Sequence, residues 1–163
     1  MLQERRERLT QRRAWLCEIL NEKLGSHVQI QYRPNHPDRQ LDEFLSAELN
    51  RGEPLAGSQL DRFLIEQAGR DVKEYSSSGQ QKHAFFQILT AVGQIFQEIR
   101  DIRPVLLLDD FDAEFDDCSR NQNLASVLNQ FQVVVTTTDP DRFAEMNPGV
   151  VHTMDGGELQ SYD

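Results

Sequence analysis

The chain reads Ser76-Ser77-Ser78-Gly79-Gln80-Gln81 and, one helix-length later, Pro104-Val105-Leu106-Leu107-Leu108-Asp109-Asp110. The first stretch is a polar loop that opens a helix, and the second is an apolar strand that ends in two carboxylates. A loop, a helix and a buried strand in this order are typical of an α/β fold, in which ligands bind beyond the carboxyl ends of the strands. These two stretches therefore carry the prediction of fold and site.

The remaining pattern predicts helices and strands on both sides of these stretches. The predicted helices cover 2–24, about 39–50, 80–100 and 119–130, with a short helix opening at Pro140, and the predicted strands cover 27–32, 63–65, 72–75, 105–108 and 131–135. A terminal hairpin is expected around Gly156-Gly157. From residue 79 onward the order predicts a parallel strand pair, and the continuous apolar run 105–108 predicts a strand covered on both faces.

Composition bounds the class of protein. A length of 163 residues fits one domain with, at most, a small appendage. No apolar run approaches the 18 or so residues of a membrane helix, and the charged N-terminus lacks the apolar region of a secretory signal. Cys17 and Cys118 form no metal-binding spacing. We therefore expect a soluble, cytoplasmic protein with free thiols and no membrane partner.

The net charge of −10 is unevenly distributed. Residues 1–13 hold two acids, Glu4 and Glu7, and five arginines: Arg5, Arg6, Arg8, Arg12 and Arg13. This segment is therefore +3 and the other residues are −13, which argues against nucleic-acid binding by bulk electrostatics. The basic segment is either a local phosphate contact or, as is more common, the solvated face of a helix.

Asp109 and Asp110 are candidate magnesium and catalytic residues. A carboxylate at the end of a buried parallel strand faces the ligand crevice of an α/β fold, and Mg²⁺ takes one or two carboxylates together with water and phosphate oxygens. Asp109 would hold the ion, and Asp110 would orient or deprotonate an attacking water. The alternative is a solvated acidic loop, because residues 109–117 are rich in acids.

The Ser/Gly loop and a threonine run are the other polar candidates. A helix N-terminus suits a phosphate, Ser77 can donate its hydroxyl, and Gly79 lets the backbone approach closely. Thr136-Thr137-Thr138 follows the apolar run Val133-Val134-Val135, so a hydroxyl there can reach a phosphate or its water. The simpler alternatives are an ordinary serine cap and the β-propensity of threonine.

Taken together, these stretches resemble the bacterial RecF family of SMC-like recombination mediator ATPases. Residues 69–82, GRDVKEYSSSGQQK, resemble the family's signature region. Leu106-Leu107-Leu108-Asp109-Asp110, followed by Ala113-Glu114-Phe115-Asp116, is similar to its Walker B strand and D-loop, and 131–139 is similar to its switch strand. The likeness is specific over 69–140 and looser over 1–68.

The resemblance implies ATP and Mg²⁺ as cofactors, bound between two subunits. Ser77, Ser78, Gly79 and Gln80 would contact ATP held by the other subunit. In their own chain, Asp109 would bind the metal, while Asp110 and Thr137 would be catalytic. Asp116 would lie at the dimer interface as part of the D-loop.

The resemblance also implies partners and a cellular process. The partners would be DNA at single-strand/double-strand junctions or gaps, a second RecF-like subunit or a half that bears Walker A, and other recombination mediators. The process would be DNA replication and repair, with the SOS response.

Two departures from the family pattern matter. The family's Gly-Pro-His-Arg-Asp-Asp stretch corresponds here to Gly57-Ser58-Gln59-Leu60-Asp61-Arg62, so its histidine and tandem acids are lost. No G-x-x-x-x-G-K-[ST] loop occurs. We therefore expect this polypeptide, by itself, neither to bind ATP tightly nor to hydrolyse it.

The predicted fold is therefore α/β, the C-terminal half of an ABC/SMC-type P-loop ATPase head without its Walker A half. We predict a helical arm with one strand over 1–55 and the ATPase subdomain over 56–163.

Two other functions remain open. One is a non-catalytic interaction module, or a remnant that pairs with an intact subunit. The other is a receiver-like phosphotransfer domain using Asp109, Asp110 and Thr136, although this sequence lacks the separate acceptor aspartate and the late lysine of such domains.

Overall fold

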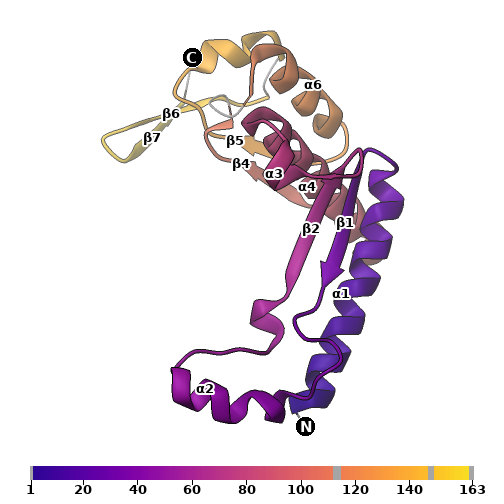
Figure 1. Cartoon of the computed structure of the whole chain (residues 1–163). Coiled ribbons are helices and arrows are strands. Elements are labelled where there is room, and N and C mark those ends of the chain that lie inside the picture. The colour runs from indigo at the N-terminus through magenta and orange to yellow at the C-terminus, as the bar shows by residue number, and fades with distance from the viewer. Residues whose placement is uncertain (1, 112–114, 147–148, 162–163) are drawn as a thin grey trace. The chain divides into compact units, whose positions relative to one another are not determined.

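A computed structural model describes residues 2–111, 115–146 and 149–161 (Figure 1). The chain divides into two compact units, Met1–Ile102 and Arg103–Asp163. The predicted boundary between residues 55 and 56 falls inside the first unit, where strands from both sides of it pair. In the ranges that the structure describes, no helix is both long and apolar enough to cross a membrane.

The first unit combines a three-stranded antiparallel sheet with two long helices. Its elements are α1 (Leu2–Leu24), β1 (Val28–Arg33), the 3₁₀ helix η1 (Leu41–Phe44), α2 (Leu45–Arg51), the 3₁₀ helix η2 (Ser58–Leu60), β2 (Arg62–Gln67), β3 (Arg70–Asp71), α3 (Val72–Tyr75) and α4 (Ser78–Arg100). The strands follow the order β1-β2-β3, with Ile30 opposite Ile65. Ala68 and Gly69, both with positive φ, form the turn between β2 and β3.

The core of this unit lies where α1 and α4 pack on β1. Cys17 and Leu20 from α1, Ile30 from β1, and Ala91 and Ile95 from α4 form one buried cluster. Burial raises the pKa of the Cys17 thiol, which therefore stays protonated at neutral pH. The predicted helices over 2–24 and 80–100 are thus confirmed, each with the apolar face that its periodicity indicates.

Two sequence predictions for this unit are wrong. Residues 72–75 form a helical turn and not a strand, because the Asp71 side chain accepts a hydrogen bond from the Lys73 N–H at 2.7 Å and caps the turn. The predicted helix over 39–50 begins later, as η1 and then α2. Glu43 accepts a hydrogen bond from the Gln40 N–H at 2.8 Å, so Gln40 is the N-cap and the helix begins at Leu41.

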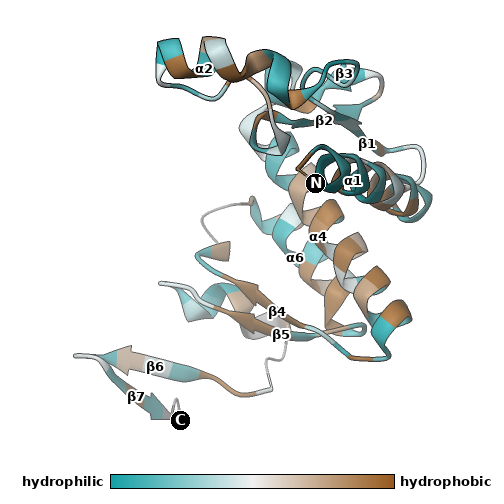
Figure 2. Cartoon of the chain, turned by 90° about the horizontal axis from the view of Figure 1, so that it is seen from below, coloured by the Kyte–Doolittle hydropathy of each residue, from teal (hydrophilic) through white to brown (hydrophobic). Residues whose placement is uncertain are grey.

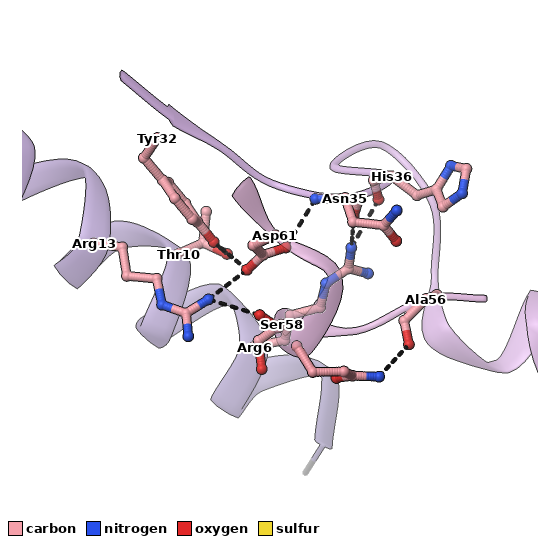
Figure 3. Close-up of polar contacts among 10 residues, drawn as sticks. Arg6, Thr10, Arg13, Tyr32, Asn35, His36, Ala56, Ser58 and Asp61 are labelled. Atoms are coloured by element: carbon pink, nitrogen blue, oxygen red, sulfur yellow. Dashed lines mark hydrogen bonds and ion pairs between the residues drawn. The ribbon is translucent and has the colours of Figure 1, made fainter. Parts of the chain in front are cut away.

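A buried carboxylate joins the helix and strands of the first unit (Figure 3). The Asp61 side chain is 2% exposed and accepts three hydrogen bonds. The donors are Arg13 Nη1 at 2.6 Å, the Tyr32 hydroxyl at 2.5 Å and the Asn35 N–H at 2.8 Å. Since these donors come from α1, β1 and the loop after β1, one carboxylate links all three segments.

Arg6 makes a second inward contact from the same helix. It is 8% exposed and donates to three backbone carbonyls of the loop after β1, those of Asn35, His36 and Arg39. Carbonyl groups of an irregular loop need donors when they are buried, and the guanidinium supplies several at once. Arg6 therefore holds the loop that leads into η1 against α1.

The second unit contains a parallel strand pair, a helix and a terminal hairpin. Its elements are β4 (Val105–Leu108), α6 (Asp117–Leu128), β5 (Gln132–Val135), the 3₁₀ helix η3 (Pro140–Met146), β6 (His152–Asp155) and β7 (Glu158–Ser161). β4 and β5 are parallel, with Leu108 opposite Val135. β6 and β7 are antiparallel around Gly156 and Gly157, which both have positive φ. The predicted parallel pair and hairpin are confirmed.

Only one face of β4 is covered, contrary to the prediction from its continuous apolar run. Leu106 and Leu108 are buried, whereas Val105 is 49% and Leu107 73% exposed. Successive side chains of a strand point to opposite faces, so the exposed pair marks one complete apolar face. Figure 2 shows both β4 and β5 as hydrophobic strands.

We expect Asp61→Ala to lower the free energy of unfolding of the first unit by about 2 kcal/mol, because it leaves the half-buried Arg13 without its anion and two further donors unpaired. Urea unfolding followed by circular dichroism measures this. Asp38→Ala, which removes an exposed carboxylate from the same unit, is the control and should change stability by no more than about 0.5 kcal/mol. Equal losses for the two variants would refute the role given to Asp61.

Candidate functional site

The strand-end cluster consists of Asp109, Asp110 and Thr136. Asp109 and Asp110 follow β4, and Thr136 follows β5. Because the two strands are parallel and Leu108 lies opposite Val135, these residues leave the sheet at the same edge. All three are exposed.

Thr136 holds the end of β4 in place through three hydrogen bonds. Its Oγ1 donates to Asp109 Oδ1 at 2.5 Å and accepts from the Asp110 N–H at 3.0 Å. Its own N–H donates to the Leu108 carbonyl at 3.0 Å. Asp110 has a φ of 47°, a left-handed conformation that costs energy for a residue with a side chain and that the bond to Thr136 helps to hold.

The threonine nearest to the carboxylates is thus Thr136, whereas the sequence singled out Thr137. The Thr137 hydroxyl is bonded within its own turn, accepting from the Asp139 N–H at 3.0 Å and donating to the Asp139 carbonyl at 3.2 Å. A catalytic role for Thr137 stays a prediction. Thr136 is the first residue after β5. Because Leu108 pairs with Val135, the strand register places Thr136 beside the end of β4.

The carboxylates of this cluster fit a magnesium ion whose remaining ligands are waters and phosphate oxygens. Within the described ranges, Asp109 Oδ2 and the Asp110 carboxylate have no hydrogen-bond or ion-pair partner. The same ranges contain no group of three or more acidic, histidine or cysteine side chains placed to hold a metal. One or two carboxylates, completed by waters and phosphate oxygens, is the usual protein contribution to a Mg²⁺ site.

Asp116, predicted as a D-loop residue, is the N-cap of α6. Its carboxylate accepts from the Ser119 N–H at 3.0 Å and from the Ser119 hydroxyl at 2.8 Å. These hydrogen bonds, first that of the backbone N–H, lower the pKa of Asp116. Ala113 and Glu114 of the predicted D-loop lie outside the described residues, whereas the Phe115 ring lies 5.0 Å from that of Phe111.

Asp117 joins α6 to η3. It accepts from Arg120 Nη1 at 2.6 Å and from Arg142 Nη2 at 3.0 Å. The hydrogen bond from Arg120 and the charges of both arginines lower the pKa of Asp117. Arg120, which is itself buried, also donates to the Arg142 carbonyl and lies over the Phe143 ring.

The signature loop, defined as Ser77–Gln80, forms the N-terminus of α4 in the first unit. Ser77 is the N-cap, with its Oγ accepting from the Gln80 N–H at 3.3 Å, and Gln80 Oε1 accepts from the Ser77 N–H at 2.9 Å. This reciprocal pair is a capping box. All four residues are exposed, so the free N–H groups and the positive end of the helix dipole face solvent.

Neither the backbone nor the packing of this chain requires glycine at position 79. Its φ is not positive, and a Cβ built there would meet nothing within 4 Å. Glycine inside a helix costs about 1 kcal/mol relative to alanine, so the sequence accepts a local loss of stability at this position. Open space in front of a helix N-terminus suits a close approach by a phosphate or by another chain.

Comparison with known proteins shows the family of the chain. Over 150 residues the chain is 31% identical to the DNA replication and repair protein RecF of Nostoc punctiforme, a match that covers 82% of this chain and 40% of that protein. It is 35% identical over 126 residues to the protein of the same name from a Geobacillus species, covering 68% of this chain and 33% of that protein. No family model matches the chain.

Solved structures show the same fold. The recombination mediator protein RecF with ATP matches 99% of this chain and 48% of its own, with a TM-score of 0.77 and 22% sequence identity. The fold is that of part of an ABC/SMC-type ATPase head, as predicted. The chain itself is RecF-like and corresponds to a C-terminal portion of RecF. It spans about two fifths of the length of the curated relatives it matches.

Thr136→Val is expected to release the end of β4. Loss of the Oγ1 hydrogen bond exposes the Asp110 N–H to solvent. A hydrogen bond is worth about 1 kcal/mol, so the hydrogen exchange of this amide should become about fivefold faster. Amide exchange by NMR measures it. Thr137→Val, which removes a hydroxyl one residue away, should leave the Asp110 amide unchanged, and equal acceleration by both variants would contradict the assignment.

Asp116→Asn should destabilise the second unit in a pH-dependent manner. The pKa of Asp116 is lowered in the folded state, so its contribution to stability is present above the ordinary aspartate value of about 3.9 and is lost as the pH falls through the folded value. In thermal unfolding, the wild type should exceed the variant at pH 6, and the two should converge toward pH 2.5. A difference that stays constant with pH would mean that the carboxylate charge adds nothing to the cap.

Proposed function

We propose that this chain supplies the C-terminal half of a RecF-like ATPase head that pairs in an ATP-dependent way and acts on DNA. The observation that carries the proposal is the strand-end cluster, in which Thr136 holds Asp109 and Asp110 at the shared edge of a parallel strand pair with carboxylate oxygens left open. Similarity to RecF over most of the chain supports the same reading.

Within this proposal each motif has one chemical task. Asp109 would hold Mg²⁺ through its open oxygen or through a water, and Asp110 would orient the attacking water. ATP, when bound, supplies the phosphoryl group and the phosphate oxygens that complete the metal's ligands. The signature loop would contact ATP held by another subunit, and Ser77, Ser78, Gly79 and Gln80 suit this task because they present a hydroxyl-rich helix N-terminus with open space at Gly79.

The Walker A loop would come from polypeptide outside these 163 residues, since they contain no such motif. Each unit has an apolar surface suited to further polypeptide. In the second unit it is the exposed face of β4 and β5, with Leu107 and Val134. In the first unit it is a stripe along α4, made of Phe85, Leu89, Val92, Phe96 and Ile99. Continuous apolar surfaces of this kind mark interaction sites.

DNA is the proposed substrate of the paired assembly, at gaps or single-strand/double-strand junctions. The relatives from Nostoc punctiforme and Geobacillus are DNA replication and repair proteins. Other recombination mediators are further proposed partners, as one solved relative belongs to the RecFOR pathway. The proposed location is the cytoplasm.

Reconstitution tests the proposal. Mixing the chain with a Walker-A-bearing N-terminal half of RecF from Nostoc punctiforme should give a complex whose pairing depends on ATP and Mg²⁺, measured by sedimentation. Ser77→Arg should abolish that pairing, because it fills the open side of the signature loop, and should leave nucleotide binding near normal. Ser26→Arg, at an exposed turn of the same unit, should pair like the wild type.

The outcomes separate the two candidate functions. Pairing that is lost only with Ser77→Arg supports the ATPase assignment. Pairing that needs no ATP and that Ser77→Arg leaves unchanged would contradict the ATPase assignment and would favour the non-catalytic interaction module. A further variant, Asp110→Asn, should keep ATP-dependent pairing while lowering hydrolysis by at least about 100-fold, the usual contribution of a positioned acid or base.

A further inference from the structure

The five arginines at the start of α1 fall into two groups. Arg6 and Arg13 point inward and are bonded to the loop after β1 and to Asp61, as Figure 3 shows. Arg5, Arg8 and Arg12 are exposed, and within the described part of the chain they form no hydrogen bond or ion pair. The inward pair stabilises the fold, so the outward three are free to bind something else.

The three outward arginines lie on one face of α1. Their spacing of three and then four residues returns to the same side of a helix with 3.6 residues per turn, and together they span roughly 10 Å of its axis. Trp15 follows three residues later on this face and is 54% exposed. The name basic face is used here for Arg5, Arg8, Arg12 and Trp15.

The charge around the basic face is locally positive in an acidic chain. The whole chain carries −10, whereas the first 13 residues carry +3. Glu7 and Glu18 lie roughly a third of a turn away from the centre of the face, and Glu4 borders it. Figure 2 shows α1 as largely hydrophilic, in contrast to α4. On this hydrophilic helix, the Trp15 indole is large, apolar and more than half exposed, so it is available to a ligand.

We propose that the basic face binds single-stranded nucleic acid, with Arg5, Arg8 and Arg12 on consecutive phosphates and the Trp15 indole stacked on a base. Positive side chains that follow a phosphate backbone, together with an aromatic ring for the bases, form the usual single-strand binding surface. Arginine adds a planar guanidinium that pairs well with phosphate oxygens.

Single strands fit this surface better than a duplex. In a duplex the bases are stacked on each other, so Trp15 has no free base to contact, and only the phosphate attraction remains. The proposal names a DNA-contacting surface for the function proposed above, and in that respect rests on it. It requires neither ATP nor a second subunit, because every residue involved lies on α1.

The test uses the 163-residue chain and a fluorescein-labelled 15-mer of deoxythymidine. Trp15 is the only tryptophan, so its emission reports directly on stacking. We expect quenching of Trp15 on addition of the oligonucleotide and an anisotropy-derived affinity that falls roughly 20-fold between 50 and 200 mM salt, as three phosphate contacts predict. A 15-base-pair duplex should bind more weakly and leave the Trp15 emission unchanged.

Three variants separate the proposal from general charge effects. The triple variant R5Q/R8Q/R12Q should lose most of the salt-dependent binding, and Trp15→Leu should weaken it by about tenfold. The variant R51Q/R62Q/R100Q removes the same charge from exposed arginines elsewhere on the first unit and is the matched control, expected to bind like the wild type. Circular dichroism confirms that each variant is folded.

Several results would overturn the proposal. They are absence of binding, equal loss in R5Q/R8Q/R12Q and in the control, and duplex binding that is as tight as single-strand binding. Competition by poly-glutamate at the same charge concentration would also overturn it, by showing that the face binds an acidic protein. Because the ATP-dependent pairing of R5Q/R8Q/R12Q with a Walker A half should be unchanged, failure here and failure of the proposed ATPase function are distinguishable.

Discussion

The buried carboxylate of Asp61 is the interaction on which the first unit depends. It accepts hydrogen bonds from α1, from β1 and from the loop after β1, three consecutive segments whose donors lie 26 to 48 residues before Asp61 in the sequence. The rotation of α1 about its axis places Arg13 inward against Asp61, together with Arg6 and the buried Cys17 and Leu20. That rotation leaves Arg5, Arg8 and Arg12 on the outside, so the inward contacts of α1 decide which basic side chains are available to a ligand.

In the second unit, a single hydroxyl has a comparable role. Parallel pairing of β4 and β5 brings the ends of both strands to one edge, and Thr136 then ties Asp109 to the Asp110 backbone. Magnesium and phosphate chemistry needs carboxylates that are fixed in direction but open to a ligand. Asp110 also has a left-handed backbone with a φ of 47°, and strained residues are common at functional sites.

Local signals predicted most of the elements, and the errors come from side-chain caps and from strand register. The apolar positions of α1 and α4 were sufficient to predict both helices, which bury Cys17, Leu20, Ala91 and Ile95 in one cluster. Residues 72–75 have the β-propensity of a strand, but the Asp71 cap makes them helical. Thr136 and Thr137 cannot be told apart in a run of three threonines, because the distinction depends on strand register. Asp61 stands in a stretch that departs from the family pattern, so its importance was hidden.

The sequence alone indicated that this chain is RecF-like, because the polar loop, long helix, apolar strand and carboxylates are each a local pattern of residue types and follow one another in the family's order. Tertiary structure decided which member of each pattern is used. Folding separates the inward from the outward arginines, selects Thr136 as the partner of the carboxylates, and leaves one face of β4 uncovered. These choices depend on register and on helix rotation, which are set by contacts between segments that no local pattern records.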